Sequence, residues 1–389
     1  MLLALSAAFL LSFGCSWGLS RWLISAAPRW GLVDRPGGTH KGHAKATPLG
    51  GGVAIYLSVV LCFLVVVLGC GLVHLVPSVG TILPEAVSVH AAGVLARTPI
   101  LLFLLTLATI QMAAGLTDDW RRDGLGWRVR LGLEVVLTLV LIWFGVRLTI
   151  HVDAWWLTIP LTILWIVGLT NAFNFLDNMD GLSGGVAACA SGLLAAIAFF
   201  VQSWFILGGF LILLGALLGF LCFNWTPARI FMGDAGSNFV GFWIATLTIV
   251  ATYHVEGFNH VTVLAPLCVL AVPIYDVTVV VCLRLLQGKS PFQPDRQHLS
   301  HRLVALGFKR PEAVLLIYLV TVTTGLGGVL LYFLRPGAGW LVVMQVVGIL
   351  GVLAILEVVS YHRQLAEIQR NEAPKEQLAK DIPSDEVTP

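Results

Sequence analysis

Residues 203–223 read SWFILGGFLILLGALLGFLCF, a run of 21 residues without one charged side chain. A helix needs about 20 mainly apolar residues to cross the hydrocarbon core of a bilayer, so this run predicts a transmembrane helix. The rest of the chain has a similar character. Hydrophobic residues make up 58% of the 389 residues and charged residues only 11%, whereas soluble domains carry about 25% charged residues. The composition argues against a soluble enzyme, a nucleic-acid binder and a disordered chain.

Ten further apolar stretches resemble the one at 203–223, and together they predict an all-α polytopic membrane protein with about 11 transmembrane helices. The first stretch has no basic residue before its apolar core and no cleavage motif after it, so we expect it to be an uncleaved span. The expected spans are about 2–26, 48–72, 99–117, 131–150, 153–170, 182–201, 203–223, 237–254, 260–286, 312–333 and 338–360.

The basic residues are distributed unevenly between the loops that these spans define. Of the 23 Lys and Arg residues, 19 lie in the loops after the odd-numbered spans or in the tail. The positive-inside rule makes that side cytoplasmic, with the N-terminus outside and the C-terminus in the cytoplasm. We expect residues 1–360 to form the membrane domain and residues 361–389 a polar cytoplasmic tail that begins as a short helix and then becomes disordered.

Five aspartates lie at the predicted cytoplasmic ends of spans, where no membrane anchor requires them. Asp118 and Asp119 end the third span, Asp177 and Asp180 follow the fifth, and Asp234 follows the seventh. Acidic residues near the membrane are costly and usually mark a functional path. A hard divalent cation such as Mg²⁺ would relieve their mutual repulsion and would also bind substrate phosphates.

Two motifs surround these aspartates. In Asn171–Leu182, NAFNFLDNMDGL, amides and carboxylates recur every third residue, which places them in a row on one face of a helix. In Phe223–Ser237, FNWTPARIFMGDAGS, Asp234 stands between glycines that allow backbone to approach a ligand closely. A solvated helix end and a plain loop are the alternative interpretations. We favour a site because all the motifs follow spans that end on the same side.

Two other loops on that side combine basic residues with histidines. One runs from Asp34 to His43, and the other from Ser290 to Leu303. Both are rich in hydrogen-bond donors suited to phosphate, although positive-inside anchoring alone would explain their charge.

At these motifs the chain resembles the polyprenyl-phosphate N-acetylhexosamine-1-phosphate transferases of the glycosyltransferase 4 superfamily, within them the WecA/TagO-like bacterial branch. The matches are the two motifs above and Pro291–His301, PFQPDRQHLSH. Two positions depart from the family pattern. At the position of the family's HxHH signature this chain has Ser300 in place of the middle histidine. In the first cytoplasmic loop it has His40 where arginine is expected.

The resemblance implies a role for each matching residue. Mg²⁺, or Mn²⁺ as the alternative ion, would be held by Asn174 and Asp234. Phe231 would stack on uracil. The implied catalytic residues are Asp118, Asp119, His298 and His301, and the implied substrate-binding residues are Lys41, His43, Asp177, Asp180, Asn224, Phe231 and Arg302.

The reaction implied by the resemblance is the transfer of GlcNAc-1-phosphate from UDP-GlcNAc to undecaprenyl phosphate, with release of UMP, in the bacterial inner (cytoplasmic) membrane. Its active site would face the cytoplasm, and it would begin a cell-envelope glycan. The partners would be a UDP-sugar, undecaprenyl phosphate and the lipid bilayer, without nucleic acid; a homodimer is left open.

The open alternatives are another UDP-N-acetylhexosamine donor, a two-step reaction with an aspartate nucleophile, and a secondary transporter with carboxylate-coupled ion movement. Transporters place such carboxylates near the bilayer midplane, so their position at helix ends favours an enzyme.

Overall fold

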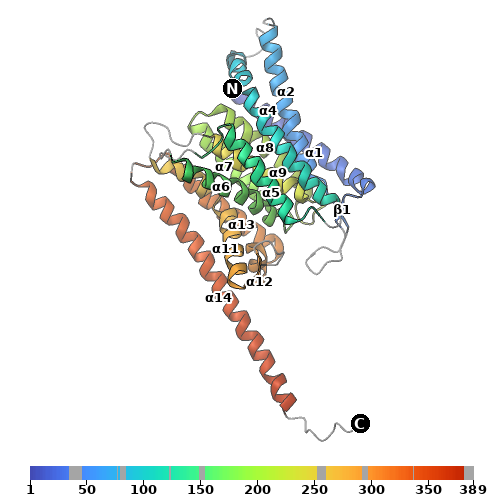
Figure 1. The fold of residues 1–389 in the computed structure, drawn as a ribbon, viewed down its shortest axis with the longest axis vertical. Coiled ribbons are helices and arrows are strands. Elements are labelled where there is room, and N and C mark those ends of the chain that lie inside the picture. The colour runs from blue at the N-terminus through green and yellow to red at the C-terminus, as the bar shows by residue number, and fades with distance from the viewer. Residues whose placement is uncertain are drawn as a thin grey trace.

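The computed structural model shows a bundle of long helices with one small hairpin (Figure 1). It describes residues 1–34, 46–76, 78, 85–121, 124–148, 154–251, 260–290, 297–335 and 337–380. The α-helices are α1 (Leu2–Ala26), α2 (Gly51–Leu75), α4 (Glu85–Trp120), α5 (Trp127–Trp143), α6 (Trp155–Leu176), α7 (Leu182–Phe200), α8 (Trp204–Asn224), α9 (Gly233–Val250), α10 (Ala265–Val269), α11 (Ala271–Leu286), α12 (Leu299–Ala305), α13 (Arg310–Leu330) and α14 (Gly339–Lys380). Two 3₁₀ helices, η1 (Ala27–Trp30) and η2 (His260–Leu264), and the antiparallel strands β1 (Val33–Asp34) and β2 (Thr47–Pro48) complete the list of elements.

A helix occupies each of the eleven predicted spans, and the prediction of an all-α polytopic protein is confirmed. Within the described ranges, eight helices are long and apolar enough to cross a membrane, or nine if the bent pair of η2–α10 and α11 forms one span. Helices α5 and α9 are not among these nine. α5 has only 17 residues, and the first turns of α9 carry polar side chains. The number of eleven spans and their orientation therefore stay predictions.

The ninth predicted span is broken. The segments His260–Val269 and Ala271–Leu286 meet at an angle of 66°. Pro273 has no backbone N–H, so the carbonyl of Val269 cannot receive its usual helical hydrogen bond at this point. The break separates an apolar first half from α11, which carries Asp276 and Arg284 towards the end of the bundle.

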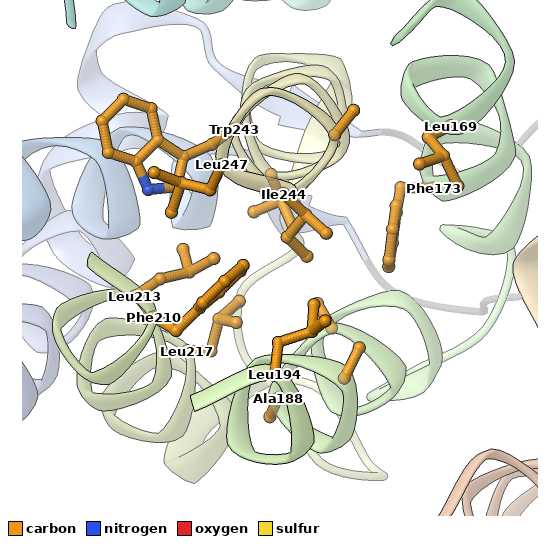
Figure 2. Close-up of a cluster of buried hydrophobic side chains, with 14 of the residues drawn as sticks. Leu169, Phe173, Ala188, Leu194, Phe210, Leu213, Leu217, Trp243, Ile244 and Leu247 are labelled. Atoms are coloured by element: carbon orange, nitrogen blue, oxygen red, sulfur yellow. The ribbon is translucent and has the colours of Figure 1, made fainter. Parts of the chain in front are cut away.

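Helix α9 lies in the middle of the bundle, and every residue from Ala235 to Ile249 is buried. Figure 2 shows Trp243, Ile244 and Leu247 of α9 among side chains of α6, α7 and α8. Gly115 of α4 lies so close to the backbone of Asp234 that a larger residue would clash. Because its buried residues pack against neighbouring helices, α9 has a fixed position and holds Asp234, in its first turn, at one end of the bundle.

Helix α14 differs from the others in length, with 42 residues. Its first half, Gly339–Val359, is apolar and packs beside α13, α11 and α12, and its second half extends well beyond the bundle (Figure 1). The predicted boundary at residue 360 therefore falls inside one continuous helix, and the helix of the tail is longer than expected.

Candidate active site

The predicted aspartates gather at one end of the bundle, which we call the site face. At this face α4, α6 and α8 end, and α5, α7 and α9 begin. Asp119, in the last turn of α4, accepts hydrogen bonds from the backbone N–H groups of Asp234 (2.9 Å) and Ala235 (3.0 Å). These are free donors at the start of α9, where the helix dipole favours an anion. A side chain at Gly233, whose φ is 71°, would meet the Asp119 carboxylate at 2.6 Å.

A cation joins two of the carboxylates. Arg130, in the first turn of α5, places Nη1 2.8 Å from Asp118 Oδ2 and 2.5 Å from Asp234 Oδ2. Asp118 also accepts a hydrogen bond from the backbone N–H of Leu125, in the loop between α4 and α5. Arg130 was counted above only among the basic loop residues, and the structure identifies it as a member of the site.

The amide of Asn174 completes this group. Asn174, in the last turn of α6, donates from Nδ2 to Asp234 Oδ1 (2.9 Å) and to Ser237 Oγ (3.0 Å). One turn earlier, Asn171 Nδ2 donates to Glu134 Oε2 at 2.5 Å, and Glu134 lies one turn after Arg130 on α5. The two amides of the predicted row therefore lie on one face of α6 and donate to carboxylates of neighbouring helices, whereas Asp177 and Asp180 follow the end of the helix.

The loop between α6 and α7 brings two more carboxylates to the site face. Asp177 follows the last residue of α6, and burial together with the neighbouring Asp234 carboxylate raises the pKa of Asp177 to about 7. Asp180 accepts a hydrogen bond from the backbone N–H of Ala228 at 3.0 Å. Asn224 accepts one from Gly181 N (3.0 Å) and donates to Ile230 O (2.9 Å). Asp180 and Asn224 thus hold two loops together, and their contact with uridine stays a prediction.

Phe231 lies at the edge of this loop pair. Its backbone N–H donates to Pro48 O at 2.9 Å, and its carbonyl accepts from Gly51 N at 2.9 Å, so the loop before α9 is joined to the β2–α2 connection. Its neighbours Ile230 and Met232 are fully buried, whereas Phe231 is partly exposed. The stacking of Phe231 on uracil stays a prediction.

The second histidine-containing loop also reaches this face. The ring of His298, just before α12, lies 5.5 Å from the ring of Phe175 between centroids. Ser300, which replaces a histidine of the family signature, is fully buried, and its hydroxyl donates to Asn178 Oδ1 at 2.6 Å. The loop with His298 is therefore attached to the α6–α7 loop through a direct hydrogen bond.

The other residues predicted from the basic loops differ in their position. Arg302, expected to bind substrate, lies beside groups of the protein: Nε is 3.0 Å from Glu357 Oε1, and Nη1 donates to Gln297 O at 2.6 Å. Its contact with substrate stays a prediction. His301 is partly buried on α12, and its role stays a prediction. Lys41 and His43 lie outside the described residues.

The donor set at the centre fits Mg²⁺ in one particular way. Among the described residues, no group of three or more His, Cys, Asp and Glu side chains is arranged to hold an ion. Mg²⁺ is usually held by one or two carboxylates and completed by water and substrate phosphates. Asp234 with the adjacent Asn174 supplies this smaller set, provided that the Asn174 amide turns its oxygen towards the ion.

Three residues of this region, Glu134, Arg130 and Asp276, had no function predicted from the sequence. Arg130 and Glu134 are four residues apart at the start of a predicted span, and such an ion-pair spacing inside an apolar segment is the signal that could have found them. Asp276 is buried in α11 and accepts from His298 Nδ1 at 3.0 Å. A buried aspartate opposite a histidine of the next loop cannot be identified from sequence spacing alone.

Comparison with known proteins gives consistent matches. Residues 100–252 match the family described as glycosyl transferase family 4. The chain is 31% identical over 298 residues to a Bacillus subtilis protein named as a probable undecaprenyl-phosphate N-acetylglucosaminyl 1-phosphate transferase, covering 75% of this chain and 74% of the relative. It is 30% identical over 376 residues to a decaprenyl-phosphate N-acetylglucosaminephosphotransferase of Mycolicibacterium smegmatis (87% of this chain, 83% of the relative). An Escherichia coli undecaprenyl-phosphate alpha-N-acetylglucosaminyl 1-phosphate transferase is 27% identical over 319 residues (78% and 77%).

Proposed function

The chain belongs to the polyprenyl-phosphate N-acetylhexosamine-1-phosphate transferase family, and from this premise we propose that it transfers GlcNAc-1-phosphate from UDP-GlcNAc to undecaprenyl phosphate, releasing UMP. One structural observation carries the proposal. Asp118, Asp119 and Asp234 converge from two helices, with Arg130 between Asp118 and Asp234 and with Asn174 also bonded to Asp234. Such a cluster suits the charge of a diphosphate and of an attacking phosphate.

The attacking group is the lipid phosphate. A phosphate monoester has a second pKa of about 6, so it is largely a dianion at neutral pH and needs little help from a base. Catalysis then depends on positioning and charge stabilisation at the sugar-bearing phosphorus. Mg²⁺ held by Asp234 and Asn174 would supply positive charge to the diphosphate oxygens.

Four side chains of the protein have separate roles in this reaction. Asp118 orients the lipid phosphate or accepts its last proton, and Arg130 holds the Asp118 carboxylate next to Asp234. Asp119 fixes the start of α9, because it receives two of that helix's backbone N–H groups. His298 approaches the diphosphate from the opposite loop. A two-step reaction with an aspartate nucleophile uses the same residues and is the alternative order of events.

The lipid chain needs an apolar path beside the site. A groove of about 930 Å³ runs between α6, α9 and the broken α10–α11 segment, with a lining that includes Leu164, Leu267 and Ile274. On α6 the lining reaches Leu169, within two turns of Asn174, whereas on α9 it comprises Thr248–Val250, at the opposite end of the helix from Asp234. The groove supports an acceptor with a long hydrocarbon chain.

We place the site face in the cytoplasm of a bacterium, at the inner membrane, because the basic residues concentrate in the loops of this face. UDP-sugars would then reach the aspartates from the soluble side. The family assignment favours a transferase over the secondary transporter considered above, and the carboxylates at helix ends agree with this choice. Another UDP-N-acetylhexosamine remains the alternative donor.

The test is an assay of UMP release by the full chain in detergent, with Mg²⁺, undecaprenyl phosphate and a panel of UDP-N-acetylhexosamines. We expect UMP release and a lipid-linked product with UDP-GlcNAc, and neither with Asp234→Ala. The same variant should show an unchanged thermal unfolding transition. A folded wild-type protein that released no UMP with any donor of the panel would refute the proposal.

A further inference from the structure

Arg302 is enclosed by acceptors of its own protein. Its guanidinium lies between two carboxylates, Glu357 Oε1 at 3.0 Å from Nε and Asp276 Oδ1 at 3.6 Å from Nη2. The Gln297 carbonyl takes a third contact, at 2.6 Å from Nη1. The side chain is only 15% exposed. These charge contacts join α12 to α11 and α14.

Asp276, on the far side of Arg302, determines the geometry of His298. The carboxylate of Asp276 is 1% exposed, and it contacts His298 Nδ1 at 3.0 Å and the backbone N–H of Leu299 at 2.6 Å. A buried carboxylate on one ring nitrogen fixes the tautomer and orientation of a histidine and directs the other nitrogen away from it. Here Nε2 of His298 is the nitrogen left for the diphosphate.

Glu357 belongs to α14, the helix that leaves the bundle. Tyr275, next to Asp276 on α11, donates its hydroxyl to Glu357 Oε2 at 2.8 Å, so Glu357 has a fixed place against α11. Its side chain is 8% exposed. A continuous series of contacts thus leads from α14 through Arg302 and Asp276 to the His298 ring.

We infer that Glu357 is a positioning residue for His298, so that α14 forms part of the framework of the active site. This inference rests on the proposed function, in which His298 contacts the diphosphate. Arg302 shares its charge between Glu357 and Asp276. Without the Glu357 carboxylate, Arg302 would turn fully to Asp276 and compete with His298 and Leu299 for its oxygens. The ring would then lose its fixed orientation.

The first test is a double-mutant cycle in the full chain. We expect Glu357→Gln to lower the kcat of UMP release about tenfold or more, as is typical when a residue that orients a functional histidine is lost, with less change in the KM for the lipid. In an Asp276→Asn background the same change should lower kcat almost no further, because the series of contacts from Glu357 to His298 is already interrupted at Asp276. The matched control is Glu312→Gln, since Glu312 is exposed at the start of α13 and contacts Lys309 there, through the backbone N–H at 2.9 Å and the ammonium at 4.0 Å.

The second test reads the His298 ring without requiring turnover. Nitrogen-15 NMR of histidine-labelled protein distinguishes the two tautomers, and a His298→Gln variant identifies the signal. The charged and titratable groups around the ring are Asp276, Arg302, Glu357 and Tyr275, with Arg284 behind Phe175. We expect protonated Nδ1 in the wild type and a mixture of tautomers in Glu357→Gln, with Tyr275→Phe showing a smaller shift in the same direction.

An unchanged His298 signal in folded Glu357→Gln, or losses of kcat that simply add in the double variant, would overturn the inference. A wild-type protein without UMP release would instead refute the proposed function. In that case the NMR measurement still decides whether Glu357 orients the ring, so the two failures can be told apart.

Discussion

The guanidinium of Arg130, at the start of α5, lies 2.5 Å from the carboxylate of Asp234, at the start of α9. The two side chains are partly exposed, at 23% and 32%, so the pair is open to a ligand that approaches the site face. The same Nη1 atom contacts Asp118 at 2.8 Å. A cation in this position offsets the repulsion between two carboxylates that would otherwise be forced apart.

Arg130→Gln should therefore reduce transfer strongly. We expect kcat to fall by about 10²–10³, the loss usually seen when one preorganised charge-stabilising donor is removed from an active site. Arg130→Lys should recover part of the rate, because it keeps the charge but loses the planar guanidinium. The control is Arg128→Gln, since Arg128 is exposed and stacks on Trp127. Equal UMP release by Arg130→Gln and Arg128→Gln would contradict this prediction.

Removal of divalent metal should abolish activity reversibly. We expect EDTA to stop UMP release and added Mg²⁺ to restore it, because the carboxylates and the Asn174 amide are hard oxygen ligands. Asp234→Asn should need a higher Mg²⁺ concentration for half-maximal rate than the wild type. Asp180→Asn provides the comparison, since Asp180 is bonded to the backbone of Ala228 and should leave the Mg²⁺ requirement unchanged. Full turnover in EDTA would rule out the metal site.

Asp118→Asn should separate catalysis from nucleotide binding. Asp118 is held by Arg130 and by the backbone of Leu125, at the end of α4 rather than in the loops assigned to uridine. We expect the rate of UMP release to fall much more than the affinity for labelled UDP-GlcNAc, measured by equilibrium binding in detergent. Loss of nucleotide binding by a folded Asp118→Asn protein would place Asp118 at the nucleotide instead of the lipid phosphate.

The features that the sequence predicted correctly depend on the position of the apolar stretches and on their order along the chain. A helix lies at each apolar stretch, and the aspartates meet because alternate spans end on the same side. The role of Arg130 in the site was not predicted, because a basic residue beside a span fits the same sequence pattern whether it anchors the helix or enters a site. The helix α9 was predicted from its apolar run, but its buried, central position could not be, because that position depends on contacts with other helices such as α4 and α6.

Arg302 shows a second limit of sequence reasoning. Its place in a phosphate-type loop favoured substrate binding, whereas the structure gives it Glu357 as a partner, 55 positions along the chain. A long-range ion pair of this kind has no spacing rule. The Ser300 departure is different, because the sequence identified the position and only the structure shows what the new side chain contacts.

Ser300→Ala should weaken the attachment between the His298 loop and the α6–α7 loop. Asn178 donates to Phe175 O at 2.6 Å and receives the Ser300 hydroxyl at 2.6 Å, so alanine would leave its partly buried carbonyl oxygen without this donor. A buried polar group that loses its partner costs about 1–3 kcal/mol, and we expect a lower unfolding temperature together with a several-fold lower kcat.

Ser300→His, which restores the family pattern, should be worse than Ser300→Ala. Ser300 is 0% exposed, so an imidazole at this position would overpack the contact with Asn178. Thr323→Ala is the control, because the Thr323 hydroxyl is exposed and only bonds the carbonyl of Leu319 in its own helix. Thermal unfolding and UMP release of the three variants decide the matter. If Ser300→His matched or exceeded the wild type in both measurements, the hydroxyl of Ser300 would not be what holds the two loops together.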